Sequence, residues 1–339
     1  MFGSRTARRA TASVVLDIEG KREETPAEHS APEPAHNGSS VSRIKDTIKT
    51  LVSIAAAQGS SISSTELFLL LPPGLFDSST DLESFLEYDA GLGLDILVRD
   101  GQVTLKGLDH LARGRPAQVS LSAERVEIAQ AFSDRLVSIC PWIDLVSISG
   151  STAYAAGKPN DDVDFYIVTR RNRLWVTLLI AMLAARFHKT KNPDSPQFCF
   201  NRIQEDDECR NSFKALQDPL FAREVLSLRI LGGHRYYIEL VKSASWMERL
   251  FPGLVHEVLT SAPVRTIVGD QDREVWSIVN GIAFVILPPY LALVGAWRNR
   301  RLARQGRHES RFRTVIRRGF FAYESRKYDL LRDIYRKVF

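Results

Sequence analysis

The sequence has little cysteine and, after its basic first residues, no apolar stretch of signal-peptide length. Its three cysteines, Cys140, Cys199 and Cys209, form no Cys-x-x-Cys pair, and an odd number cannot all be paired within one chain. Cys140 and Cys199 lie among apolar residues, as core thiols usually do. We therefore expect a protein of the reducing cytoplasm rather than a secreted one.

The sequence also lacks the histidine spacing of common metal sites, and no Ser-His-Asp arrangement can be read from its order. Hydrophobic residues make up 44% and charged residues 25%, which is ordinary for a soluble protein and does not decide its class. The net charge of +5 is concentrated toward the C-terminus. The residues responsible are Arg298, Arg300, Arg301, Arg304, Arg307, Arg311, Arg313, Arg317 and Arg318. Such a run is more often a solvated helix face than a contact for nucleic acid or membrane.

Changes in composition divide the chain into four parts. Residues 1–41 are poor in apolar periodicity and predict a disordered tail. Residues 42–115 predict three short helices followed by a hairpin that turns at Asp100 and Gly101, which is typical of a winged-helix-like domain. Residues 116–260 contain the core described below, and residues 261–339 predict a helical C-terminal region.

The winged-helix-like segment lacks the basic residues typical of a DNA-binding domain in the helix that would read the DNA. Its third helix carries Asp81, Glu83 and Glu87 and almost no basic residues, whereas phosphate contacts need Lys or Arg. We favour a structural or protein-contact role for this segment over DNA binding.

The stretch from Gly150 to Thr169 carries the chemistry. It lies between two short apolar runs that predict buried strands. Gly150 and Ser151 directly follow the first strand, where exposed backbone N–H groups allow a phosphate to approach. Asp162 and Asp164 are two residues apart, so strand alternation directs both carboxylates to one side. Two such oxygen ligands suit Mg²⁺.

This order of strand, Gly-Ser, Asp-x-Asp and strand resembles the polymerase-β-like nucleotidyltransferase superfamily. The resemblance implies an α+β fold: a minimal nucleotidyltransferase core in which a mixed sheet has helices on one face. It also implies that Gly150 and Ser151 bind a nucleoside triphosphate and that Asp162 and Asp164 are catalytic residues binding one or two Mg²⁺ ions. Lys158 is a weaker candidate for a phosphate contact, as is Arg170.

Over roughly 42–252 the order of segments is similar to an uncharacterised bacterial family in which a winged-helix-like segment precedes such a core. One departure concerns a third carboxylate, which active superfamily members usually supply from a later strand. The strand beginning at Phe198 offers Asn201 instead, an amide that is a weaker Mg²⁺ ligand and cannot act as a base. Asp194 before that strand and Glu205 after it remain two candidates.

Three functions follow from these patterns. The first is a Mg²⁺-dependent enzyme that transfers a nucleoside monophosphate from a nucleoside triphosphate to an unidentified acceptor hydroxyl. The second is a catalytically impaired nucleotide-binding regulatory protein, which Asn201 favours. The third is a winged-helix DNA-binding regulator, with nucleic acid as a less favoured partner.

Residues 278–297 are apolar and are followed by arginines, which fits membrane association through a transmembrane helix whose C-terminal side is cytoplasmic. Pro288 and Pro289 would break such a helix in mid-span, so buried or interfacial packing is the favoured alternative. The segment from Arg311 to Phe339 predicts an amphipathic helix.

Overall fold

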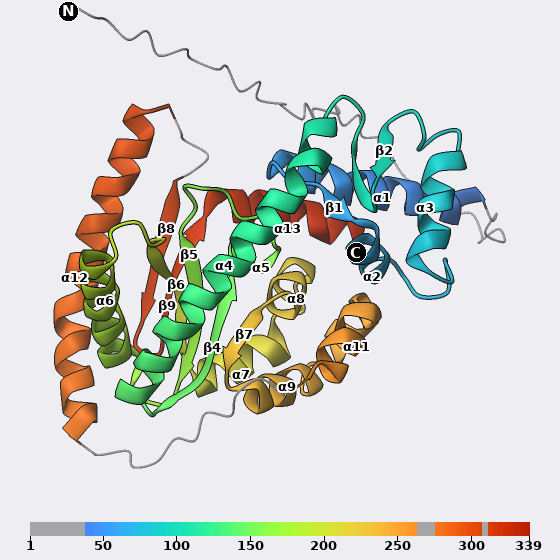
Figure 1. Cartoon of the computed structure of the whole chain (residues 1–339). Helices are drawn as coiled ribbons and strands as arrows, with labels where there is room; N and C mark the ends of the chain where they lie inside the picture. The colour runs from blue at the N-terminus through green and yellow to red at the C-terminus, as the bar shows by residue number, and fades with distance from the viewer. Residues whose placement is uncertain (1–37, 263–274, 307–310) are drawn as a thin grey trace, which may run out of the picture.

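The computed structural model describes residues 38–262, 275–306 and 311–339 (Figure 1). Most of the predicted disordered tail, residues 1–37, lies outside the described residues. The described chain is an α+β structure with a six-stranded mixed sheet and a small three-stranded antiparallel sheet. The α+β class and the mixed sheet agree with the prediction from the sequence.

The N-terminal part folds as three helices and three short strands. They are α1 (Gly38–Ala57), β1 (Ile62–Ser63), α2 (Ser64–Leu70), α3 (Ser79–Tyr88), β2 (Ile96–Arg99) and β3 (Gln102–Leu105). The side chains of Ser63 and Ser78 accept hydrogen bonds from the first turns of α2 and α3, which fixes where these helices begin. Asp100 and Gly101 turn the β2–β3 hairpin with φ angles of 50° and 68°. The predicted helices and hairpin are confirmed.

Helix α4 (Asp109–Ile139) runs from the small sheet to the large one without a break. The helical patterns over Leu108–Arg115 and Ser122–Ile139 predict two separate helices here, and this prediction is wrong. A proline inside a helix costs about 3 kcal/mol, but α4 is held on both sides of it. Arg115 Nη1 donates to Ser60 Oγ at 2.8 Å, and Ser122 Oγ accepts from the N–H of Gly157 at 3.0 Å. The predicted boundary between residues 115 and 116 therefore falls inside one helix.

The large sheet has the strand order β7-β4-β5-β6-β9-β8. Its strands are β4 (Ile143–Ser149), β5 (Val163–Thr169), β6 (Phe198–Glu205), β7 (Arg229–Gly232), β8 (Phe312–Arg317) and β9 (Phe320–Ser325). Strands β5 and β6 are parallel and every other pair is antiparallel.

Helices cover both faces of this sheet, so the prediction of helices on one face is wrong. On β5, Phe165 and Ile167 pack with α4, α6 (Leu174–Lys191) and α12 (Val275–Arg304), whereas Tyr166 and Val168 pack with the opposite layer. That layer contains α7 (Asp206–Ala215), α8 (Pro219–Leu226), α9 (His234–Lys242), α10 (Ser245–Leu250) and α11 (Pro252–Thr260). Because β5 is apolar on both sides, its sequence is a continuous apolar run rather than an alternating one.

The C-terminal region is only partly helical. Helix α12 is continuous through Pro288 and Pro289, so the predicted break is wrong. Residues 312–325 form β8 and β9 rather than a helix, and α13 (Arg326–Val338) follows. Strand β9 pairs with β6, which buries Phe320 and Phe321 and makes the segment part of the large sheet. Pairing with a distant strand thus decides the conformation of this segment.

Candidate functional site

Gly150 stands where β4 ends and the short helix α5 (Gly150–Ala153) begins. Its φ angle is +66°, a conformation that side chains other than glycine rarely adopt. A Cβ atom added to Gly150 would lie 2.5 Å from Oδ2 of Asp164. The missing side chain therefore lets the Asp164 carboxylate lie directly against the backbone at the end of β4. Asp164 is also the register partner of Ser149 on β4.

Asp162 and Asp164 lie close together at the start of β5, as the sequence predicts. Burial raises the pKa of Asp164 to about 7, and the negative charge of Asp162 adds to this effect. Burial also raises the pKa of Asp162, while the nearby Arg298 opposes the rise. Both carboxylates are therefore partly removed from water at one strand end, and a bound cation would favour their charged forms.

Ser151 already has a hydrogen-bond partner within the loop. Its hydroxyl donates to Oδ2 of Asp161 at 2.9 Å, and the N–H of Lys158 donates to the same oxygen at 3.0 Å. Asp161 thereby closes the loop between α5 and β5. Lys158 Nζ donates to the carbonyl of Gln58 at 2.6 Å, so its ammonium group holds the loop against the end of α1.

The other weaker phosphate candidate lies elsewhere. Arg170 follows the far end of β5, where its Nε is 3.7 Å from Asp144 Oδ1. The structure does not bring it to Gly150 and Asp164.

On the neighbouring strand β6, Cys199 occupies the position beside Asp164. A hydrogen bond from the Cys199 thiol to the Asp164 carboxylate opposes the rise in the pKa of Asp164. Cys199 Sγ also lies 3.4 Å from Oδ1 of Asn201, which is thus near the site as the sequence predicts. A thiol and an amide stand where a third carboxylate is expected.

Neither of the two substitute carboxylates reaches the site. Glu205 ends β6 at the opposite edge of the sheet, paired in register with Thr169, and accepts hydrogen bonds from backbone N–H groups at the start of α6. Asp194 is exposed in the turn before β6.

Two arginines that the sequence does not assign to the site contribute positive charge to this edge. Arg298, near the C-terminal end of α12, partly offsets the rise in the pKa of Asp162. Arg125 on α4 does the same, and its Nη2 donates to the carbonyls of Lys158 and Pro159 at 2.5 and 3.1 Å. Arg125 is 3% exposed, and its Nη1 has no hydrogen-bond partner among the described residues. The burial of Arg125 on a helix also indicates that it acts on the charge of Asp162.

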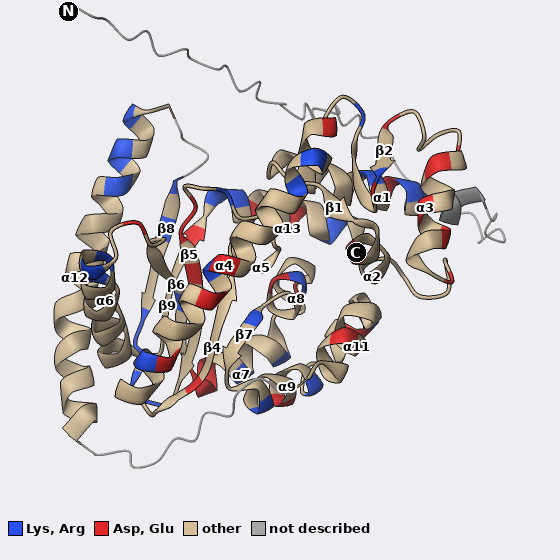
Figure 2. Cartoon of the chain, viewed as in Figure 1, with Lys and Arg blue, Asp and Glu red and all other residues tan. Residues whose placement is uncertain are grey.

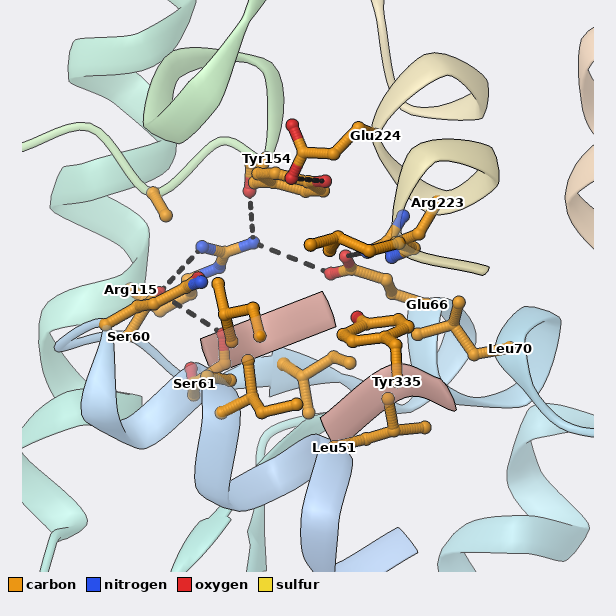
Figure 3. Close-up of a pocket in the computed structure, with 17 residues that line it drawn as sticks. Leu51, Ser60, Ser61, Glu66, Leu70, Arg115, Tyr154, Arg223, Glu224 and Tyr335 are labelled. Atoms are coloured by element: carbon orange, nitrogen blue, oxygen red, sulfur yellow. Dashed lines mark hydrogen bonds and ion pairs between the residues drawn. The ribbon is translucent and has the colours of Figure 1, made fainter. Parts of the chain in front are cut away.

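A small cavity lies beside this edge, between the N-terminal helices, α4, α8 and α13 (Figure 3). Tyr154 connects the cavity to the site: its hydroxyl donates to Glu224 Oε1 at 2.9 Å, and its carbonyl accepts from Arg115 at 2.8 Å. Glu66 forms ion pairs with both Arg115 and Arg223. The volume is about 60 Å³, room for water or a small ion but far below the several hundred Å³ of a ligand site.

The chain matches no family model, no curated protein and no solved structure. Its function must therefore be inferred from its own residues.

Proposed function

We propose that the chain is a nucleotidyltransferase whose site lies at the junction of β4, α5 and β5. The observation that supports this most strongly is the contact between Gly150 and Asp164. A left-handed glycine after one strand leaves room for a carboxylate from the next, with Asp162 beside it. This is the arrangement expected of the Gly-Ser and Asp-x-Asp elements of the polymerase-β-like superfamily.

In this proposal Asp162 and Asp164 hold one Mg²⁺ ion. Mg²⁺ is commonly held by one or two protein carboxylates and completes its shell with water and substrate phosphates, so this donor set fits. When bound, the ion would neutralise charge on the transferring phosphate. A second ion would need a further ligand, and no group of three or more His, Cys, Asp and Glu side chains suited to a metal occurs among residues 38–262, 275–306 and 311–339.

The remaining residues would bind and orient the triphosphate. The N–H groups of Gly150 and Ser151 open α5, and the first N–H groups of a helix have no acceptor within it. The Ser151 hydroxyl donates to Asp161 in the free chain, so it would turn away from Asp161 in order to donate to a triphosphate oxygen. Arg125 and Arg298 would offset the charge of the bound phosphates.

A nucleotide-binding regulatory protein is the second candidate. Cys199 and Asn201 favour it, because neither side chain supplies the general base that a third carboxylate would supply. Such a protein would bind a nucleoside triphosphate with Mg²⁺ and release no pyrophosphate.

We propose a structural role for the N-terminal, winged-helix-like part. Helix α3 contains no Lys or Arg, which argues against a phosphate-contacting recognition helix. Glu66 on α2 instead pairs with the buried Arg223 of α8, so this part contacts the helices of the large sheet through an ion pair.

Titration of the full chain with each of the four nucleoside triphosphates, with and without Mg²⁺, tests the proposal. We expect saturable, Mg²⁺-dependent binding that is lost in Asp162→Asn and retained in Asp194→Asn, which removes an exposed carboxylate near the same edge. Absence of binding in the wild-type chain, or equal binding by both variants, would contradict the assignment. A pyrophosphate assay with candidate acceptors then separates the enzyme from the regulatory protein.

A further inference from the structure

Helix α12 is apolar on two opposite sides. One side is buried against α6 and the sheet through Ala283, Leu287 and Leu291. The other is open to solvent: Ile278 is 66%, Val285 71% and Leu293 72% exposed. We call the exposed side the apolar row, formed by Val275, Ile278, Ile282, Val285, Ile286, Tyr290, Leu293 and Trp297. A row this long on one helix marks an interaction surface rather than scattered surface residues.

Helix α12 lies beside α6 and β8 (Figure 1), and polar contacts hold it there near both ends. Near its start, Oδ1 of the buried Asn280 accepts hydrogen bonds from the N–H groups of Trp175 and Val176 at 2.8 and 3.1 Å. Near its end, Asn299 donates to the carbonyl of Phe312 and accepts from its N–H, at 2.7 and 3.0 Å. By length and composition α12 could cross a membrane, but crossing would break these contacts. The apolar row is therefore available only to something that lies against the helix.

The charges on α12 are all positive and all lie at its C-terminal end (Figure 2). Arg300 and Arg304 are exposed and follow Leu293 and Trp297 by seven residues each, so helical spacing places them in line with the apolar row. Along α12 the apolar row is followed by a tryptophan at its border and then by arginines. This order suits a bilayer interface. Indole sits at the headgroup level, and guanidinium groups meet lipid phosphates.

We propose that the apolar row of α12 docks on an anionic lipid surface, with the row among the headgroups and upper acyl chains and Arg300 and Arg304 at the lipid phosphates. Charge complementarity favours lipid over a second copy of the chain. Helix α12 contains no Asp or Glu, so a second α12 would offer no partner for the arginines, whereas anionic headgroups would. This inference does not depend on the proposed nucleotide site.

Co-sedimentation of the full chain with lipid vesicles tests the proposal. We expect binding to phosphatidylcholine vesicles that contain phosphatidylglycerol, and weak binding to phosphatidylcholine alone. Leu293→Ser should weaken binding by roughly tenfold or more, since burying a large apolar side chain contributes that much. Arg300→Ala and Arg304→Ala should each weaken it by roughly fivefold, and by less at high salt.

Leu94→Ser is the matched control, because Leu94 is 75% exposed but lies far from α12 in the N-terminal part. Circular dichroism checks that each variant is folded. No binding to either kind of vesicle, or equal binding by Leu293→Ser and the wild type, overturns the proposal. A dimer in sedimentation that Leu293→Ser converts to a monomer, with no vesicle binding, would assign the apolar row to a second copy instead.

Discussion

Replacing Asp164 by Asn should make the protein more stable at neutral pH and above. Asn has nearly the same shape, so it keeps the packing against Gly150, but it cannot carry the charge that burial and Asp162 disfavour. The pKa of Asp164 is about 7 in the folded chain, above its ordinary value of 3.8. The folded state therefore binds the proton more tightly than the unfolded state.

The sign and size of the effect follow from this difference. As the pH rises from about 4 to about 7, the unfolded chain loses the Asp164 proton first, so the wild-type chain loses stability over this window. The shift corresponds to about 4 kcal/mol at 1.36 kcal/mol per pKa unit. Because Asp164 keeps part of its surface exposed, this is an upper bound. The stability gained in Asp164→Asn should grow between pH 4 and 7 and level off above pH 7.

Urea unfolding of both chains at several pH values, without divalent ions, measures the difference directly. Asp194→Asn serves as the control and should change stability little at any pH, because its side chain is exposed. Adding Mg²⁺ at pH 8 should raise the stability of the wild type and not that of Asp164→Asn. If the difference in free energy of unfolding between Asp164→Asn and the wild type stays constant from pH 4 to 8, the raised pKa of Asp164 is contradicted.

Two further substitutions test the surroundings of the site. Gly150→Ala should destabilise the fold by about 2 kcal/mol or more, because Gly150 has a left-handed backbone and contacts Asp164. Gly114→Ala in α4, which has open space around it, should be neutral or slightly stabilising. Thermal melts compare the two variants. Glu66→Ala should lower the free energy of unfolding by about 3 kcal/mol or more, because it leaves buried Arg115 and Arg223 without their carboxylate. Urea unfolding measures this difference. A decrease no larger than that of Glu83→Ala on α3 would argue against the pairing.

The parts of the fold that the sequence predicts correctly depend on neighbouring residues. The hairpin at Asp100 and Gly101 and the two strands around Gly150 are set by local turn chemistry and by short apolar runs. The wrong predictions concern elements whose conformation depends on distant partners. Residues 312–325 have both aromatic and basic residues at helix-like intervals, and the pairing of β9 with β6 and of β8 with β9 makes them strands.

The candidate site divides in the same way. Gly150, Ser151, Asp162 and Asp164 come together because they flank adjacent antiparallel strands, which the spacing along the chain indicates. Arg298 lies more than 130 positions further along the chain, and nothing in its local sequence separates it from the other arginines of its cluster. Its proximity to Asp162 follows from the packing of α12 against α6 and β8.

Helix α12 links the two proposals physically without making either depend on the other. Arg298 is directed toward β8, where its guanidinium lies 5.4 Å from the centre of the Phe312 ring, and its charge acts on Asp162. Arg300, two residues later, is in line with the exposed apolar row. Docking that keeps the buried contacts of α12 would leave Arg298 in place, so vesicle binding should not alter nucleotide binding. Detachment of α12 from α6 would instead remove a positive charge from Asp162 and raise its pKa further, which a nucleotide titration in the presence of vesicles would detect as a change in affinity.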